Sequence, residues 1–120
     1  MTNRQQIGRW GEQCAAEFLV GKGYQLVARN ARTPFGEIDL IFRSDGQIVF
    51  VEVKTRTSLA YGLPEEAVDR RKGEHILKAA DAYLQEHPEL DDDWRVDVIA
   101  IIGKPENNKP QIEWFQDAIS

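Results

Sequence analysis

The hydrophobic positions of this chain follow two different periods, which predict helices and strands in mixed order. Between residues 7 and 21, apolar side chains recur every three or four positions, as on one face of a helix: Ile7, Trp10, Cys14 and Phe18. A second helix is predicted over residues 69–87, where Asp69 can cap the first turn and Pro88 follows the last. The remaining apolar residues lie in shorter runs.

These shorter runs predict strands. They are separated by turn residues, are rich in Val, Ile and Phe, and cover residues 24–32, 36–43, 47–56, 94–102 and 111–119. Residues 58–68 are expected to form a loop or lid with a short extended end. Both faces of the 48–56 strand are largely apolar, which is typical of a strand covered by helices on both sides. The pattern therefore predicts an α/β fold with a central mixed β-sheet flanked by α-helices.

The turn between the second and third predicted strands sets their register. Asp45-Gly46 between two apolar runs predicts a two-residue hairpin turn. One face of the hairpin is then wholly apolar, with the opposed pairs Ile38 and Val53, Leu40 and Val51, and Phe42 and Val49. A shift by one residue would mix polar and apolar side chains on both faces, so the pattern itself supports this register.

The other face of the hairpin carries charges that folding alone does not require. The same register opposes Asp39 to Glu52 and Glu37 to Lys54, with opposed Cβ atoms about 5 Å apart. Two carboxylates at that separation repel each other, and their burial is costly unless they are paired or bind a metal. We therefore expect Asp39 and Glu52 to bind Mg²⁺ or Mn²⁺, with the Val53 carbonyl as a third ligand.

Lys54 lies two residues after Glu52 and therefore shares its face. Its ammonium could orient or help deprotonate a metal-bound water for attack on a phosphodiester, and it could offset charge that develops during the reaction. Two structural alternatives stay open. Glu37 and Lys54 could form a cross-strand ion pair, and Asp39 could be a protonated or water-bridged carboxyl group.

Composition narrows the classes of protein that this sequence can represent. No apolar run approaches the ~20 residues that cross a bilayer, and the first residues lack an apolar segment followed by a cleavage site. We expect a single domain over residues 1–120, a cytoplasmic location and no membrane partner. Cys14 is the single cysteine, which excludes an internal disulfide, and two histidines do not make a zinc-type ligand set.

The net charge of −5 is unfavourable for binding phosphates. The charge is uneven, however, because residues 1–32 carry five basic and two acidic side chains. Arg70, Arg71 and Lys72 also open the second predicted helix, where the helix dipole disfavours cations. A phosphate-binding surface should therefore involve the N-terminal half of the chain, and the start of the second helix is a further candidate.

The spacing of Asp39, Glu52 and Lys54 resembles that of the PD-(D/E)xK nucleases, although Pro34 is not adjacent to Asp39. A longer set of motifs resembles the YraN-like family of uncharacterised bacterial proteins: GRWGE (8–12), AAEFL (15–19), GY (23–24), RNAR (29–32), GEIDLI (36–41), VFVEVKTR (49–56), PEEAV (64–68) and RVDVIAI (95–101). That family is regarded as endonuclease-like, with a fold similar to that of archaeal Holliday junction resolvases.

The resemblance implies a restriction-endonuclease-like core and a metal-dependent endonuclease that hydrolyses DNA phosphodiester bonds. Its partner would be DNA, branched or processed, and a homodimer is left open. The resemblance assigns catalysis to Asp39, Glu52 and Lys54, and it adds Glu12 of the first helix as an acidic residue near the metal. The alternative is a non-catalytic nucleic-acid-binding or adaptor module that retains the nuclease fold.

Three further residues are candidates for contacts with substrate: Glu37, Arg56 and Lys72. Arg56 continues the face of Glu52 and Lys54. Arg56 could contact a phosphate or form a surface salt bridge, and the sequence does not decide between them.

Overall fold

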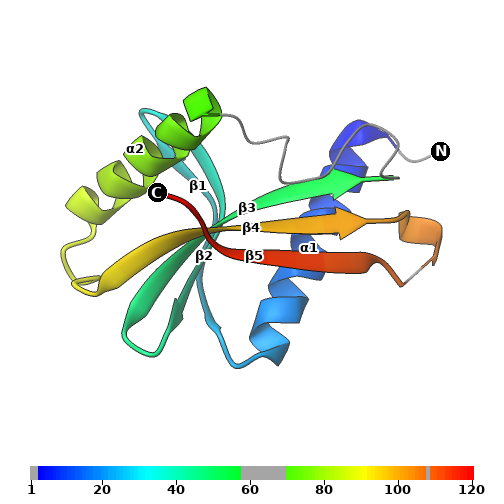
Figure 1. The fold of residues 1–120 in the computed structure, drawn as a ribbon, viewed down its shortest axis with the longest axis horizontal. Helices are drawn as coiled ribbons and strands as arrows, with labels where there is room; N and C mark the ends of the chain where they lie inside the picture. Colours follow the sequence, from blue (N-terminus) through cyan, green and yellow to red (C-terminus); the bar gives the residue numbers. More distant parts are fainter. Residues whose placement is uncertain (1–2, 58–69, 108) are drawn as a thin grey trace.

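The computed structural model describes residues 3–57, 70–107 and 109–120, and in that part of the chain five strands form one mixed sheet in chain order (Figure 1). The strands are β1 (Gln25–Thr33), β2 (Gly36–Ser44), β3 (Gln47–Arg56), β4 (Asp93–Ile102) and β5 (Gln111–Ile119). β3 and β4 are parallel, and the other neighbouring pairs are antiparallel. The predicted α/β fold is confirmed, and its arrangement is consistent with a restriction-endonuclease-like core.

Two α-helices cover opposite faces of this sheet in the described part of the chain (Figure 1). α1 (Arg4–Gly21) precedes the sheet, and α2 (Arg70–Glu86) lies in sequence between the parallel strands β3 and β4. None of the described helices has an apolar stretch long enough to cross a bilayer. The loop predicted over 58–68 and the predicted Asp69 cap lie outside the described residues.

α1 begins at Arg4, before the first residue of its apolar stripe. The Asn3 side chain accepts a hydrogen bond from the Gln6 N–H (2.9 Å), and the Gln6 side chain accepts one from the Asn3 N–H (3.0 Å). This capping box satisfies N–H groups that the helix itself leaves without partners. Because its residues are polar, the apolar period that marked the helix from residue 7 could not reveal this first turn.

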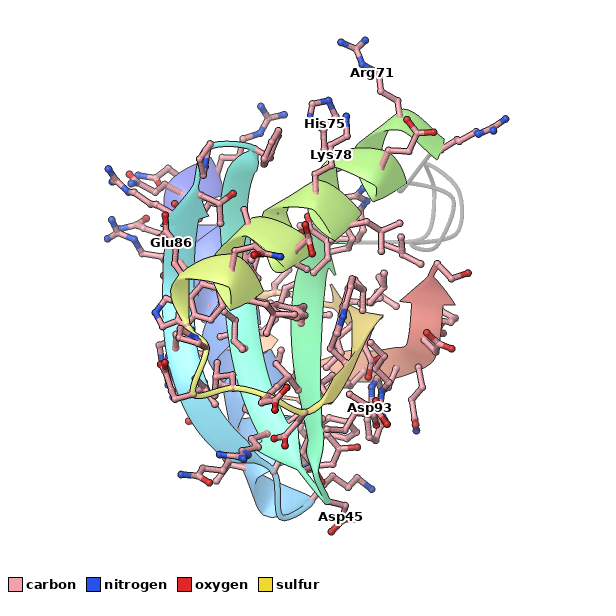
Figure 2. The ribbon with its side chains drawn as sticks, turned by 90° about the vertical axis from the view of Figure 1, so that its left-hand side faces the viewer. Asp45, Arg71, His75, Lys78, Glu86 and Asp93 are labelled. Carbon is pink, nitrogen blue, oxygen red and sulfur yellow. The ribbon has the colours of Figure 1, made fainter. Side chains whose placement is uncertain are left out.

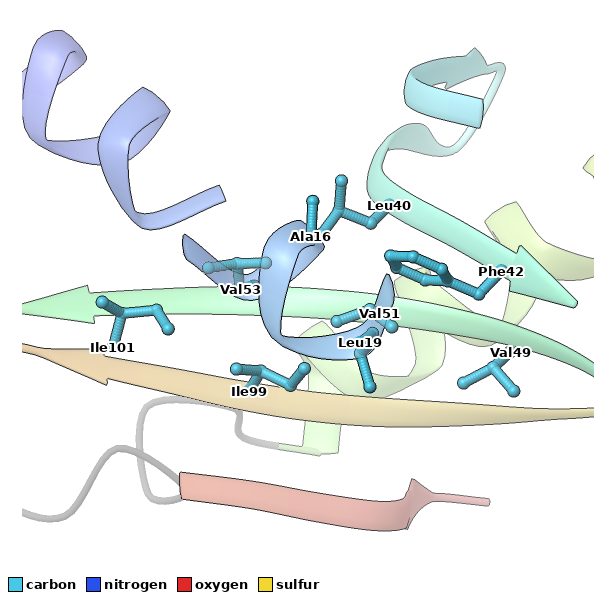
Figure 3. Close-up of a cluster of buried hydrophobic side chains, with 10 residues drawn as sticks. Ala16, Leu19, Leu40, Phe42, Val49, Val51, Val53, Ile99 and Ile101 are labelled. Carbon is cyan, nitrogen blue, oxygen red and sulfur yellow. The ribbon is translucent and has the colours of Figure 1, made fainter. Parts of the chain in front are cut away.

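The larger buried cluster lies between α1 and the sheet (Figure 3). Ala16 and Leu19 of α1 pack against aliphatic and aromatic side chains from the central strands: Leu40, Phe42, Val49, Val51, Val53, Ile99 and Ile101. Alternate residues of β3 point into this cluster, as the period of a strand requires. The apolar face predicted for residues 49–53 is therefore the face that α1 covers.

The second cluster lies between the sheet and α2. Ile41, Ile48 and Phe50 pack there with helix residues Ala79 and Ala80. Ile38 also belongs to this cluster, although the predicted register placed it with Leu40 and Val53 on the α1 face. Regular alternation along β2 therefore fails between residues 38 and 40.

The predicted hairpin register is confirmed over the turn half of β2 and β3. Leu40 is paired with Val51, Phe42 with Val49, and Arg43 with Ile48. The pairing of these strands ends at Leu40, so the expected ladder pairs of Asp39 with Glu52, Glu37 with Lys54, and Ile38 with Val53 are not formed. β2 instead continues its pairing with β1 up to Gly36, so between Gly36 and Asp39 it is paired with β1 and not with β3.

Candidate active site

A cleft of about 630 Å³ opens where β2 separates from β3. β3 contributes its last residues, from Glu52 to Arg56, and β2 contributes Asp39. The first turns of α1 line the same cleft with Arg4, Ile7, Gly8 and Glu12. Side chains from three elements that are distant in sequence therefore meet around one hollow at the end of the sheet.

Asp39 joins the two separating strands through its side chain. Its Oδ2 accepts a hydrogen bond from the Val53 N–H at 2.9 Å, in place of a main-chain ladder bond from β2. The pKa of the Asp39 carboxyl is raised from 3.8 to about 7, first by burial and then by the negative charge of Glu52. The Val53 bond and the Lys54 charge act in the opposite direction, and Glu12 contributes a smaller increase. Asp39 and Glu52 are thus close enough to interact, although they are not a ladder pair.

Glu52 and Lys54 form an ion pair within β3. The Lys54 Nζ lies 3.2 Å from the Glu52 Oε1, and only 9% and 14% of the two side chains are exposed. The predicted shared face is confirmed, whereas the alternative ion pair between Glu37 and Lys54 is not formed. Glu37 instead accepts a hydrogen bond from Asn30. Lys54 is therefore a buried cation held at the cleft beside a carboxylate.

Asn30 links the two outer carboxylates of the site, and sequence reasoning did not identify it. Its Nδ2 donates to Glu12 Oε1 at 3.1 Å and to Glu37 Oε1 at 3.0 Å. Its backbone has a φ of 48°, in the left-handed region, at the position of β1 that faces the irregular part of β2. A signal was present, because asparagine is depleted in strands and tolerates the left-handed conformation better than other side chains.

A close helix-to-strand contact brings Glu12 to the cleft. Gly11 is buried, and a Cβ atom at this position would overlap the hydroxyl oxygen of Thr55. The lack of a side chain at Gly11 therefore lets α1 approach β3 directly beside Lys54. Glu12, the next residue of the helix, is partly buried and lines the cleft with Asp39.

The oxygen donors of the cleft fit a hard divalent cation such as Mg²⁺ or Mn²⁺. Asp39 and Glu52 bring two carboxylates together, and Val53 lines the same cleft. Among the described residues, no group of three or more His, Cys, Asp or Glu side chains is placed to hold a metal. Mg²⁺ keeps several waters and takes only one or two carboxylates from a protein, so two such groups are sufficient.

Comparison with known proteins places these residues in a family. The family described as "Uncharacterised protein family UPF0102" matches residues 11–101, which include Glu12 and the whole hairpin. The chain belongs to this family. UPF0102 proteins from Clavibacter michiganensis subsp. michiganensis and Caldicellulosiruptor bescii are 43% and 44% identical to it, over 98% and 97% of the chain and 99% and 98% of the relatives. A third, from Dehalococcoides mccartyi, is 38% identical over 98% of the chain and 95% of the relative.

Two further basic candidates of this UPF0102 protein lie near Lys54, and one of them, Arg56, lines the cleft. Lys72, in the first turn of α2, has its pKa lowered by a hydrogen bond with Lys54, and its partial burial acts in the same direction. The half-buried Arg56 lines the cleft, and its Nη1 donates to the Thr55 carbonyl at 3.2 Å. The structure therefore brings Lys72 to Lys54, the candidate catalytic lysine. Lys72 belongs to α2, which covers the face of the sheet opposite to α1.

A buried network in the UPF0102 protein lies apart from the cleft. Asp97 is fully buried and accepts hydrogen bonds from Arg95, from the Trp114 indole and from the Asp117 N–H. Arg95 in turn donates to Tyr24. None of these residues lines the cleft. The network joins β4 to β5 and, through Tyr24, to the turn between α1 and β1, which gives these carboxylate and guanidinium groups a structural explanation.

Proposed function

We propose that this UPF0102 protein is a metal-dependent endonuclease that hydrolyses DNA phosphodiester bonds, with branched or processed DNA as its substrate. The observation that carries the proposal is the meeting of Asp39, Glu52 and Lys54 in one cleft at the point where β2 leaves β3. Two carboxylates beside a buried lysine form a set that structural folding does not require. Such a set suits phosphodiester hydrolysis because it can hold a cation and position a water.

Each residue has a distinct part in this proposal. Asp39 and Glu52 would hold the cation, which would polarise the phosphodiester and lower the pKa of a bound water. Lys54 would orient that water and would stabilise negative charge on the phosphate as the bond breaks. Its burial between β3 and its neighbours restricts its conformations, so the ammonium is already placed at the cleft.

One observation favours the alternative, a non-catalytic nucleic-acid-binding or adaptor module. Lys54 already has a carboxylate partner in Glu52 at 3.2 Å, so the two groups are electrostatically satisfied without substrate. In an adaptor this ion pair would be permanent. In an enzyme Lys54 must share its ammonium between Glu52 and the substrate.

A cleavage assay separates the two functions. Purified protein at low ionic strength with Mn²⁺ is incubated with labelled junction, flap, single-stranded and duplex DNA. We expect cleavage of at least one branched DNA, a loss of about 10² or more in rate for Lys54→Ala, and loss of both metal binding and cleavage for Glu52→Gln. Lys22→Ala, at the exposed end of α1, is the matched lysine control and should cut at the wild-type rate. No cleavage of any substrate, or equal rates for wild type and Lys54→Ala, would exclude the enzyme.

A further inference from the structure

The outward face of α2 carries a row of basic side chains that the proposed cleft does not use. Arg71, His75 and Lys78 are exposed and lie within about 60° of one another around the helix axis. Figure 2 shows the three projecting from the same side of α2, away from the sheet. Within the described residues, neither Arg71 nor Lys78 takes part in an ion pair, whereas the neighbouring Arg70 is paired with Glu74.

The stability of the helix does not explain Arg71, the first residue of this row. The first turn of α2 has no acidic residue and consists of Arg70, Arg71 and Lys72. Three cations at a helix N-terminus are disfavoured by the helix dipole and by their mutual repulsion. A negatively charged ligand would relieve both effects.

The row leads to an exposed aromatic ring on the turn between β1 and β2. Phe35 is 45% exposed, and its backbone is fixed because Thr33 Oγ1 accepts from the Phe35 N–H (3.1 Å) and donates to the Gly36 carbonyl (2.7 Å). Phe35 and Lys78 line one groove of about 510 Å³, together with Pro34 and Ala82. Asp81 and Glu86 also border this groove, so its charged lining is one basic and two acidic side chains. Attraction for phosphate must therefore come from Lys78 together with Arg71, which lies outside the groove on the same face of α2.

Both ends of this surface are connected to the cleft. Lys72, next to Arg71 in the chain, contacts Lys54. Phe35 precedes Asp39 by four residues along β2, which is at most about 13 Å of extended chain. A nucleic-acid strand that leaves the cleft can therefore reach the basic row and the aromatic ring within a few nucleotides.

We propose that Arg71, His75, Lys78 and Phe35 form a track that binds a single-stranded segment of DNA. Arg71 and Lys78 contact its phosphates, and an unpaired base stacks on Phe35. The inference rests on the proposed function and specifies its substrate as DNA with unpaired nucleotides beside the bond that is cut. Single-stranded DNA is the occupant because only an unpaired base can offer its face to an exposed ring, whereas the basic row alone would not distinguish strand from duplex.

The stacking part of the proposal is tested by the binding of a short fluorescein-labelled oligothymidine at low salt in EDTA, followed by fluorescence anisotropy. Phe35→Ala should weaken binding about tenfold, whereas Phe35→Tyr should bind as tightly as wild type, because stacking needs an aromatic ring. Val20→Ala removes another exposed apolar side chain, 52% exposed on α1, and should bind as tightly as wild type. Equal affinities for wild type and Phe35→Ala would overturn the track. A shift of the Phe35→Ala protein from dimer to monomer in sedimentation, without a change in DNA affinity, would also overturn it and would assign this face to a second copy of the chain.

The phosphate part is tested by the salt dependence of the same binding. Replacing both Arg71 and Lys78 by Ala should make the negative slope of log K against log salt less steep by about 1.4, because each contact with single-stranded DNA contributes roughly −0.7. Arg43→Ala removes an exposed arginine paired with Asp92 at the other end of β2 and should leave the slope unchanged. An unchanged slope in the double variant would overturn the track.

The binding measurements are independent of cleavage, because EDTA removes any metal. If the protein cuts no DNA but Phe35→Ala still loses binding, the proposed enzyme fails and the track stands. If the protein cuts DNA but Phe35→Ala binds as wild type, the track fails and the enzyme stands.

Discussion

Asp39 is subject to two opposing influences when no metal is bound. The Val53 N–H favours its ionised form, whereas burial and the charge of Glu52 favour the protonated form. The second influence is stronger, and the pKa rises from 3.8 to about 7. Between these two values the folded state binds more protons than the unfolded state, so the free energy of unfolding decreases as the pH rises.

Asp39→Asn should therefore stabilise the metal-free protein. Asparagine can still accept the Val53 N–H, but it carries no charge to bury. We expect a gain in unfolding free energy that is small at pH 4, grows to roughly 1–4 kcal/mol at pH 7 and levels off above that. Denaturant unfolding in EDTA across this pH range measures it, with the exposed Glu17→Gln as control. A gain that did not change with pH would show that the charge of Asp39 is not its source.

A second prediction at the scale of one residue concerns the effect of substitutions at Asn30 on stability. At a φ of 48°, a Cβ atom is strained in alanine but absent in glycine. Asn30→Ala should therefore be less stable than Asn30→Gly by about 1 kcal/mol, the reverse of the usual order inside a strand. Both variants lose the amide that holds Glu12 and Glu37, so their difference in thermal unfolding reports the backbone alone. The usual order, with alanine more stable, would contradict the left-handed conformation.

At the scale of elements, the position of α1 over β3 depends on Gly11, and Gly8 of the same helix provides a comparison. A Cβ atom at Gly11 would overlap the Thr55 side chain, whereas one at Gly8 would meet nothing within 4 Å. The two positions lie in the same helix, three residues apart, and Gly8 lines the cleft. They therefore separate the effect of helix propensity from the effect of the helix-to-strand contact.

Gly11→Ala and Gly8→Ala should change stability in opposite directions. Gly11→Ala forces α1 away from β3 and should destabilise the protein by about 1–3 kcal/mol. Gly8→Ala gains helix propensity and should stabilise it by up to about 1 kcal/mol. Chemical unfolding of the two variants beside wild type measures both values. Stabilisation by both substitutions would show that α1 does not approach Thr55 as described.

The hairpin of β2 and β3 shows which pairings could be predicted from the sequence and which could not. The Asp-Gly turn and the alternation of apolar residues were sufficient to predict the pairing from Arg43 to Leu40, because both are local signals. The same arithmetic failed at Asp39. The separation of β2 from β3 depends on β1, on Asn30 in a left-handed conformation, and on a side chain that replaces a ladder bond, and none of these follows from the hairpin alone.

At the scale of the whole molecule, the sheet and its two covered faces could be predicted because the apolar periods of helices and strands are strong. The grouping of Asp39, Glu52 and Lys54 was expected from spacing on two adjacent strands. The contact between Lys72 of α2 and Lys54 could not be predicted from the sequence, because it depends on how the helix packs across the sheet. The sequence showed only that Lys72 belongs to a cluster of basic residues at the start of the second helix.

Metal binding should be visible in the stability of the whole fold. A cation held by Asp39 and Glu52 binds the folded state, and a hundredfold excess over its Kd would add about 2.7 kcal/mol to the free energy of unfolding. Mn²⁺ or Mg²⁺ should therefore raise the melting temperature of wild type and of Glu17→Gln, and should leave that of Asp39→Asn unchanged. Calorimetry that gave the same metal affinity for wild type and Asp39→Asn would remove this site.

The side-chain bond between Asp39 and Val53 makes one backbone amide a spectroscopic reporter of the cleft. The other edge of β3 stays paired with β4 as far as Arg56, so Glu52 and Lys54 are held from one side while Asp39 approaches from the other. Any ligand that draws on the Asp39 carboxylate must alter the environment of the Val53 N–H. Its resonance in a nitrogen-15 spectrum should therefore shift more during a titration than those of amides in the β4–β5 half of the sheet. Its hydrogen-exchange rate should follow the occupancy of the cleft without an attached probe.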